Sequence, residues 1–330
     1  MSDSAVESSP TIRMTRAEFR ATAYLAGVSG LRMLGLFIVL PVLALYAASL
    51  PGGSDPAMIG FAIGAYGLAQ AVLQIPFGWA SDRVGRKPAI AFGLVVFAAG
   101  SFVAAWAPDI GWLAAGRTLQ GAGAVSAAVM ALAADLTRDE VRTRAMAMIG
   151  ITIGATFAVS LVAGPVLGSA IGVPGIFVLT GLLAIAAIAV VQFGVPDADA
   201  GARGHGGGGE RVALRRVLAD PQLLRLDFGI FALHAILMAL FVQVPFALRD
   251  AGIAPSRHWM VYLPVLVVSV GVVLPLFRSV DRPGRGKTVL AGAIAALVAS
   301  MLILAAARSS LATIVAGLAV FFCAFNLLEA

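Results

Sequence analysis

Long apolar runs recur along this chain, and they constrain its fold more than any other feature. A helix that crosses a hydrocarbon core of about 30 Å needs roughly 20 residues, and runs of about that length alternate with short polar connections. Backbone groups in lipid must be satisfied within a helix or a closed barrel, and these runs lack the period-two alternation of barrel strands. We therefore expect an all-α membrane protein built from continuous transmembrane helices. Ten spans are predicted: Ala23–Tyr46, Ile59–Trp79, Pro88–Trp106, Gly111–Ala134, Ala145–Ile171, Gly175–Val195, Leu226–Leu248, Trp259–Phe277, Thr288–Ala307 and Leu311–Ala330.

Composition excludes most other classes of protein. The chain is 60% hydrophobic and only 12% charged, whereas soluble proteins are about 45–50% apolar and about 25% charged. The net charge of +6 sits in short clusters between the spans, so no surface remains that could follow a nucleic-acid backbone. Because Cys323 is the single cysteine, neither a disulfide framework nor a Cys/His metal site is expected. We expect no metal, no cofactor and no nucleic-acid partner.

Basic residues predict the orientation of the chain. They gather on alternate connections, such as the one that carries Arg83, Arg86 and Lys87 after the second predicted span. Connections rich in Lys and Arg lie on the cytoplasmic side of a membrane. The N-terminus and the connection around Asp82 are therefore predicted to be cytoplasmic.

An internal repeat predicts two pseudo-symmetric helix bundles. Five residues recur at one constant spacing about two hundred positions later, and a repeat of this kind is typical of transporters. The first copy is Pro76, Asp82, Arg83, Gly85 and Arg86, and the second is Pro275, Asp281, Arg282, Gly284 and Arg285.

The repeat divides the chain into three parts. We expect a six-helix bundle over residues 1–195, a cytoplasmic glycine-rich linker over 196–225 and four helices over 226–330. Since a six-plus-six duplication is the expected design, the ten predicted helices are interpreted as part of a twelve-helix protein whose C-terminal end is truncated. A natural ten-span protein is the alternative.

Polar side chains inside the spans are the candidate functional residues. Placing an ionisable side chain within the bilayer costs about 2.5 kcal/mol or more in free energy, so such a residue is expected to have a function. The four charged or titratable ones fall in the first, fourth, seventh and tenth predicted spans, each the first helix of a three-helix unit. We therefore predict that they face a polar central cavity. The candidates are Arg32, Arg117, His234 and Glu329, together with Gln120, Gln243 and Asn326.

Each of these residues also has a structural interpretation. His234 is either a neutral packing residue or a proton-responsive group paired with an acid. Glu329 lies either near an interface or in a proton-coupling site. Arg117 and Gln120, three residues apart on one helix face, form either a buried structural pair or part of the cavity.

Small residues in the fifth predicted span indicate a seam between helices. Gly154, Gly164 and Gly168 allow close approach of a neighbouring helix, and Pro165 bends the helix. We expect a hinge or packing seam here rather than a contact with substrate.

Three motifs in order resemble the Major Facilitator Superfamily. The run from Gly78 to Lys87 is similar to the loop between the second and third helices, and the run from Arg117 to Gly121 is similar to the fourth-helix motif. The run from Gly154 to Gly168 is similar to the fifth-helix motif of drug:proton antiporters. The resemblance covers nearly the whole chain.

The resemblance implies a fold, a mechanism and a gate. It implies a monomeric, twelve-helix, multi-pass protein of the bacterial inner membrane that moves a small solute by alternating access, with the proton gradient as energy source. It also implies that Asp82 contacts the eleventh helix and that Arg86 pairs with Asp135. The gate residues so implied are Gly78, Asp82, Arg83, Gly85, Arg86, Lys87 and Asp135, with a repeat at Asp281, Arg282, Gly284 and Arg285.

The leading hypothesis is proton-coupled export of small amphipathic solutes or drugs. In it Glu329 and His234 respond to protons, while Arg32 and Arg117 tune them. A truncated, non-transporting membrane protein or sensor and a proton-independent facilitator of a metabolite are the alternatives. An enzyme is not expected, because no nucleophile–base set and no catalytic residues are found.

Overall fold

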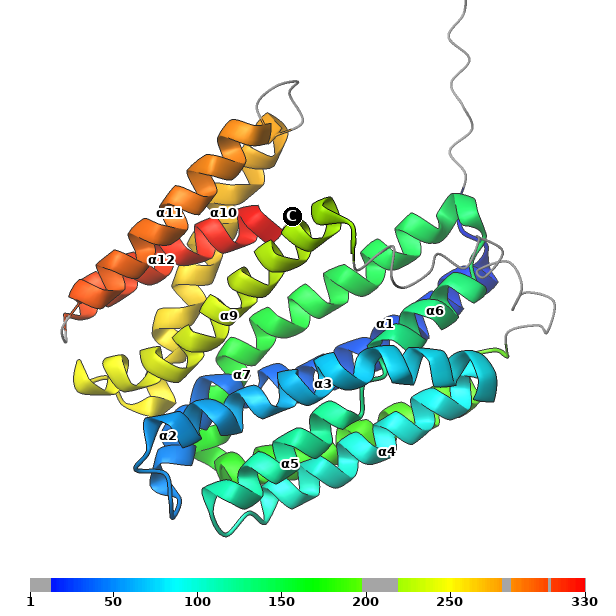
Figure 1. The fold of residues 1–330 in the computed structure, drawn as a ribbon, viewed down its shortest axis with the longest axis horizontal. Helices are drawn as coiled ribbons and strands as arrows, with labels where there is room; N and C mark the ends of the chain where they lie inside the picture. Colours follow the sequence, from blue (N-terminus) through cyan, green and yellow to red (C-terminus); the bar gives the residue numbers. More distant parts are fainter. Residues whose placement is uncertain (1–12, 198–218, 281–285, 308–309, 330) are drawn as a thin grey trace, which may run out of the picture.

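A computed structural model describes residues 13–197, 219–280, 286–307 and 310–329 of the chain, and within these ranges every regular element is a helix (Figure 1). We refer to residues 13–197 as the first half and to residues 219–329 as the second half. The predicted gate repeat at Asp281, Arg282, Gly284 and Arg285 lies outside the described residues, as does most of the predicted linker.

The first half contains seven α-helices and one π-helical turn. They are α1 (Arg16–Phe37), α2 (Leu40–Ser49), α3 (Pro56–Val84), α4 (Arg86–Ala105), α5 (Ile110–Ala122), α6 (Ser126–Asp135), α7 (Asp139–Ala189) and η1 (Val190–Gly194). Helix α1 begins with a capping box, in which Thr15 and Glu18 each accept the other's backbone N–H. Asp55 and Asp109 cap α3 and α5 with their side chains, which accept the backbone N–H of Ala57 and of Trp112.

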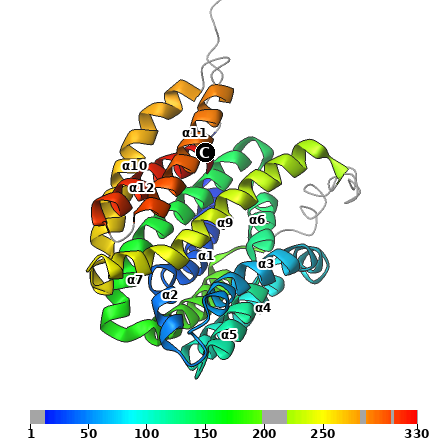
Figure 2. The ribbon, with the colours of Figure 1, turned by 60° about the vertical axis from the view of Figure 1, so that its left-hand side comes forward.

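The second half contains four described α-helices and one 3₁₀ turn. They are α9 (Pro221–Asp250), η3 (Pro255–Arg257), α10 (Trp259–Val280), α11 (Gly286–Ala306) and α12 (Leu311–Glu329). Figure 2 shows α10, α11 and α12 side by side, and α12 contacts α9, α10 and α11.

The expectation of continuous helices is wrong at two of the predicted spans. The first predicted span is broken at Ile38 and Val39, because Pro41 in the first turn of α2 has no N–H to donate. The fourth is broken between α5 and α6, where a Cβ on Gly123 would lie 2.4 Å from the carbonyl oxygen of Gly93. Close packing against α4 therefore needs glycine at this break.

The fifth and sixth predicted spans form one long helical segment with a kink. Gly172 interrupts α7 with φ +70° and ψ 168°, a conformation open essentially to glycine alone. This residue lets the chain reverse between the two apolar runs.

Eight helical segments in the described residues are long and apolar enough to cross a membrane. This number is smaller than the ten predicted spans for two reasons. Helices α5 and α6 are each too short to cross a membrane, and α7 with η1 forms one continuous segment, Asp139–Gly194, where two spans were predicted. The fold is therefore an all-helical, multi-pass membrane fold, and the number ten stays a prediction.

The two halves are joined at one end of the molecule. The largest apolar cluster contains residues of both halves, including Leu43 and Phe177 of the first and Leu237 and Phe321 of the second. Contacts between the halves run from α2 and α3 to α9 and from α7 to α10 and η3. A second apolar cluster, which includes Leu25, is built from first-half residues alone. We call the end with α2 and η3 the closed end and the opposite end the open end.

Gly172→Ala is expected to destabilise the protein by about 1–3 kcal/mol, because alanine disfavours the backbone conformation at the kink. Gly150→Ala is the matched control in the same helix, since a Cβ there would meet nothing within 4 Å and alanine favours a helix by up to about 1 kcal/mol. Thermal unfolding of the purified protein in detergent measures both. Equal melting temperatures for Gly172→Ala and the wild type would contradict the account of the kink.

Candidate functional site

One aromatic ring of the first half lies against rings of the second half. Phe157 of α7 meets Phe241 of α9 with ring centroids 6.2 Å apart and Phe322 of α12 at 6.5 Å. On its own side it contacts Phe37 of α1 at 5.1 Å, edge to face. Such pairs add about 0.5–1.5 kcal/mol each beyond their buried area. This aromatic contact ties α7 to α9 and α12.

Arg32 is buried among neutral partners of the first half. Its side chain donates to the hydroxyl of Ser126 at 2.7 Å, the hydroxyl of Tyr66 at 2.8 Å and Oε1 of Gln70 at 2.6 Å. These bonds hold α1 to α3 and α6. Within the described residues no carboxylate pairs with this guanidinium, and its Nε has no partner.

Arg117 forms a second buried polar group beside the first. It donates to Oε1 of Gln120 at 2.9 Å, and Gln120 donates to the hydroxyl of Ser101 at 2.7 Å. Its guanidinium carbon lies 4.9 Å from the centre of the Tyr66 ring. Tyr66 therefore touches both arginines, by its hydroxyl and by its ring.

His234 and Glu329 face each other across α9 and α12 in the second half. Nε2 of His234 lies 3.9 Å from Oε1 of Glu329, and the side chains are 46% and 52% exposed. The other ring nitrogen, Nδ1, is 3.0 Å from the carbonyl oxygen of Ile230. Because a carbonyl can only accept, Nδ1 donates to it, so Nε2 is the ring nitrogen that faces the carboxylate.

The remaining cavity candidates lie in the same half but apart from this pair. Asn326 donates to the hydroxyl of Ser269 at 3.0 Å, which ties α12 to α10. Gln243 lines a pocket of about 440 Å³ together with Asp250, at the α9 end nearest η3. In the part of the chain that the structure describes, no bond joins Arg32 or Arg117 to His234 or Glu329.

The gate residues form a compact charged cluster between α3, α4 and α6. Arg86 pairs with Asp82, donates from Nε to Asp135 at 3.2 Å and from Nη1 to the hydroxyl of Ser81 at 2.8 Å. The Arg86–Asp135 pair is the one that the resemblance implies. Gly85, with φ +108°, makes the turn from α3 to α4.

Other residues of the predicted gate have separate contacts. The guanidinium of Arg83 lies 3.5 Å above the ring of Trp79. Lys87 pairs with Asp197 at 3.0 Å. A Cβ on Gly78 would make ordinary contact with Ala127 of α6 at 3.5 Å.

The fifth-helix glycines do not all lie at a seam. A Cβ on Gly164 would lie 2.3 Å from the carbonyl oxygen of Ile38, at the break between α1 and α2, and one on Gly168 would lie 3.2 Å from Val42. Pro165 is buried beside them. At Gly154 a Cβ would meet nothing within 4 Å. Among the three glycines of this motif, close approach is therefore confined to Gly164 and Gly168.

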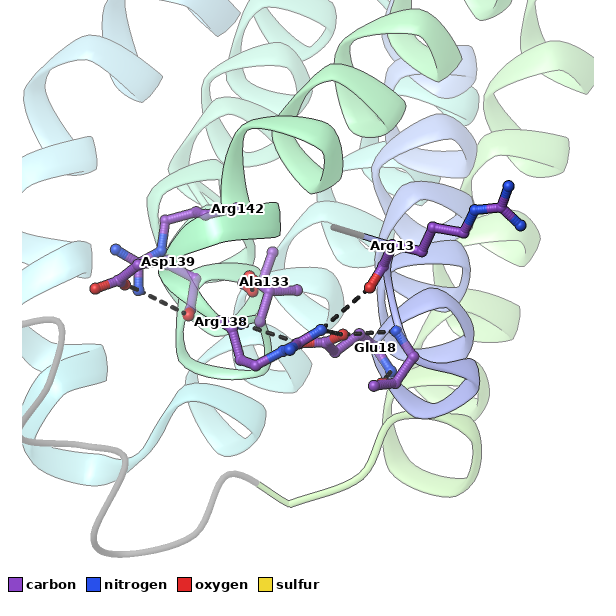
Figure 3. A network of polar contacts seen from close by, with 9 residues as sticks. Arg13, Glu18, Ala133, Arg138, Asp139 and Arg142 are labelled. Atoms are coloured by element: carbon purple, nitrogen blue, oxygen red, sulfur yellow. Dashed lines mark hydrogen bonds and ion pairs between the residues drawn. The ribbon is translucent and has the colours of Figure 1, made fainter. Parts of the chain in front are cut away.

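An ion pair that the sequence did not predict, between the half-exposed Arg138 and the buried Glu18, joins the start of α1 to the turn before α7 (Figure 3). Arg138 donates from Nε to Oε1 of Glu18 at 2.8 Å and from Nη2 to Oε2 at 3.1 Å, and its backbone N–H reaches Oε1 at 3.2 Å. The carboxylate of Glu18 raises the pKa of Arg138 above its ordinary value. Thr15-x-x-Glu18 has the spacing of a capping box, but nothing in the spacing indicates a partner 120 positions away.

Comparisons with known proteins agree with this architecture. The family model described as Major Facilitator Superfamily matches residues 25–329. The chain is 45% identical over 318 residues to the inner membrane transport protein YajR of Escherichia coli K12, covering 96% of this chain and 70% of that protein.

Solved structures share the fold at low sequence identity. A bacterial homolog of the human lysosomal transporter Spinster, inward-facing and unoccupied, matches with a TM-score of 0.74 and 15% identity, over 96% of this chain and 74% of that one. A D-xylose–proton symporter matches with a TM-score of 0.67 and 15% identity, over 94% and 80% of the two chains.

Glu18→Gln and Arg138→Gln are each expected to lower the melting temperature, because either change leaves the partner's charge uncompensated. The double variant is expected to melt no lower than the worse single one, since the two residues act as a unit. Arg142→Gln is the control. Within the described residues, the ion pair that Arg142 forms is with the exposed Asp139, three residues earlier in the same helix. Additive losses in the double variant would contradict the pairing.

Proposed function

The chain belongs to the Major Facilitator Superfamily of membrane transporters, not to an enzyme family, and on that premise we propose that it is a proton-coupled exporter of small amphipathic solutes. The observation that carries the proposal is the His234–Glu329 pair. It is an acid and a base whose nearest side-chain atoms are 3.9 Å apart on two transmembrane helices, both half exposed. YajR is an inner membrane transport protein, and the proposal extends transport across an inner membrane to this chain.

Proton binding at this pair changes charge between two helices. With Nδ1 of His234 held by the Ile230 carbonyl, a proton on Nε2 creates an imidazolium that attracts the carboxylate of Glu329. A second proton, on Glu329, removes that attraction. The pair therefore couples protonation to the relative position of α9 and α12, which is what an antiporter needs if the solute is to exchange with protons.

The arrangement of the halves supports alternating access. The halves are joined at the closed end by the aromatic contact around Phe157, and within the described residues no ion pair crosses between them. If the N-terminus is cytoplasmic, as the basic residues predict, the open end faces the cytoplasm and the conformation is inward-facing. The Arg86–Asp82–Asp135 cluster lies at that end, where we propose that it acts as the gate.

Two buried arginines favour neutral or acidic solutes. Arg32 and Arg117 are 2% and 1% exposed, and no described carboxylate compensates either charge. In a region of low dielectric such charges act over several ångströms. Because both are buried, they act through their field rather than by contact, and a cationic solute would be disfavoured.

Glu329→Gln is expected to reduce pH-gradient-driven flux at least tenfold, because the amide cannot exchange a proton. The purified chain is reconstituted in proteoliposomes, and flux of the anionic dye 1-anilinonaphthalene-8-sulfonate and of the cation ethidium is followed with and without a pH gradient. Glu140→Gln, an exposed acid at the start of α7, is the control and keeps wild-type flux. The anionic dye is expected to be the better substrate.

Three results would count against the proposal. Solute flux that is independent of the pH gradient would indicate a proton-independent facilitator. No flux of any probe by the wild type would favour the sensor. Unchanged gradient-driven flux in Glu329→Gln would show that protons bind elsewhere.

A further inference from the structure

A groove runs between α1 and α7 in the first half, outside the polar sites described above. Its volume is about 690 Å³, and small or apolar residues line it, among them Gly27, Gly30 and Leu31 of α1 and Ala155, Thr156 and Val159 of α7. A Cβ at Gly27 would meet nothing within 4 Å. The groove is therefore open at Gly27, because this residue has no side chain to fill it.

The walls of the groove offer little to a polar occupant. Three residues with a hydroxyl line it, Tyr24, Thr152 and Thr156, and the two threonine hydroxyls are already used within their own helix. Thr152 donates to the carbonyl oxygen of Met148 at 2.9 Å, and Thr156 donates to that of Thr152 at 2.7 Å. An apolar chain fits such a surface better than a polar solute does.

Two arginines stand at the head of the same face of α1. Arg20, Ala23, Gly27, Gly30 and Leu34 follow one another at three- and four-residue steps, which places them along one side of a helix. Arg16 precedes Arg20 by one further turn. A second cavity of about 350 Å³ lies here, lined by Met14, Thr15, Arg16, Phe19 and Arg20.

The positive charges of Arg16 and Arg20 are available to a ligand. Both residues are exposed, and within the described residues neither forms a hydrogen bond or an ion pair. Glu18, the acid of the same turn, is buried and bonded through both oxygens to Arg138. Phe19 between them is 55% exposed, so the head of the groove joins two cations and an apolar ring.

The distance from the arginines to the middle of the groove matches one leaflet of a bilayer. Ten residues separate Arg20 from Gly30, a rise of about 15 Å along a helix. Half of a hydrocarbon core of about 30 Å is the same length. An anion at Arg20 would therefore lie at the membrane surface while a chain in the groove reaches the bilayer centre.

We propose that this groove binds one anionic phospholipid, with its phosphate between Arg16 and Arg20 and an acyl chain along Ala23, Gly27 and Leu31. The site joins α1 to α7, the two helices that also carry Phe37 and Phe157 of the aromatic contact. A bound lipid stabilises the first half by filling the open space beside Gly27. Basic residues near a membrane surface attract anionic lipid headgroups.

Native mass spectrometry of the delipidated full chain tests the proposal directly. The protein in a neutral detergent receives dioleoylphosphatidylglycerol or dioleoylphosphatidylcholine, which share their acyl chains, and the affinity for the first bound lipid is measured. The wild type is expected to prefer the anionic lipid by about thirtyfold, the effect of two surface arginines. Equal affinities would overturn the proposal.

Two pairs of variants separate the headgroup from the chain. Arg16→Gln/Arg20→Gln is expected to abolish the preference, whereas Arg249→Gln/Arg257→Gln, at the closed end, keeps it. Gly27→Leu is expected to weaken binding of both lipids at least fivefold, because leucine fills the groove. Gly60→Leu on α3 is its control, since a Cβ there also meets nothing within 4 Å. Circular dichroism checks that each variant is folded.

Other occupants predict different results, and each would overturn the proposal. If glycerol 3-phosphate displaces the anionic lipid at an affinity equal to the lipid's own, the site holds only a phosphate. If Gly27→Leu abolishes dye flux in liposomes of phosphatidylcholine but leaves lipid affinity unchanged, the groove holds the transported solute. Loss of the preference in the Arg249→Gln/Arg257→Gln control would place the lipid at the closed end.

Discussion

The contact of Phe157 with Phe241 and Phe322 is the interaction on which the proposed transport cycle depends. Two halves that rock about a central site need a contact strong enough to close one end and weak enough to separate. Aromatic pairs of about 0.5–1.5 kcal/mol each meet that need, and a buried ion pair would not, because separating it leaves charges unpaired. Gly164 allows α7, the helix that carries Phe157, to pack directly against the break between α1 and α2.

Charge is distributed unequally between the halves. The first half holds Arg32 and Arg117 in fixed hydrogen-bond networks that share Tyr66. The second half holds His234 and Glu329 as an exposed, loosely spaced pair. In the proposed proton-coupled transporter, the two arginines of the first half keep a constant positive charge. Only the pair in the second half needs to change its charge during the cycle.

The sequence predicted what depends on composition and spacing and missed what depends on distant packing. The apolar runs were enough to indicate a helical membrane protein, and the family resemblance was enough to pair Arg86 with Asp135. The breaks at Ile38 and Gly123 were not predicted, because an apolar pattern looks the same in a continuous and a broken helix. The Glu18–Arg138 pair joins residues that no local rule connects, and the neutral partners of Arg32 could not be identified before the packing of α1, α3 and α6 was known.

Distance measurement between spin labels across the open end tests the central claim most directly. Labels are placed at Val84, at the end of α3, and at Leu224, near the start of α9, both exposed, in a chain carrying Cys323→Ser. Alternating access coupled to protons predicts two distance populations whose ratio changes with pH in the wild type and stays fixed in Glu329→Gln. A single distance that is the same at every pH would contradict the account.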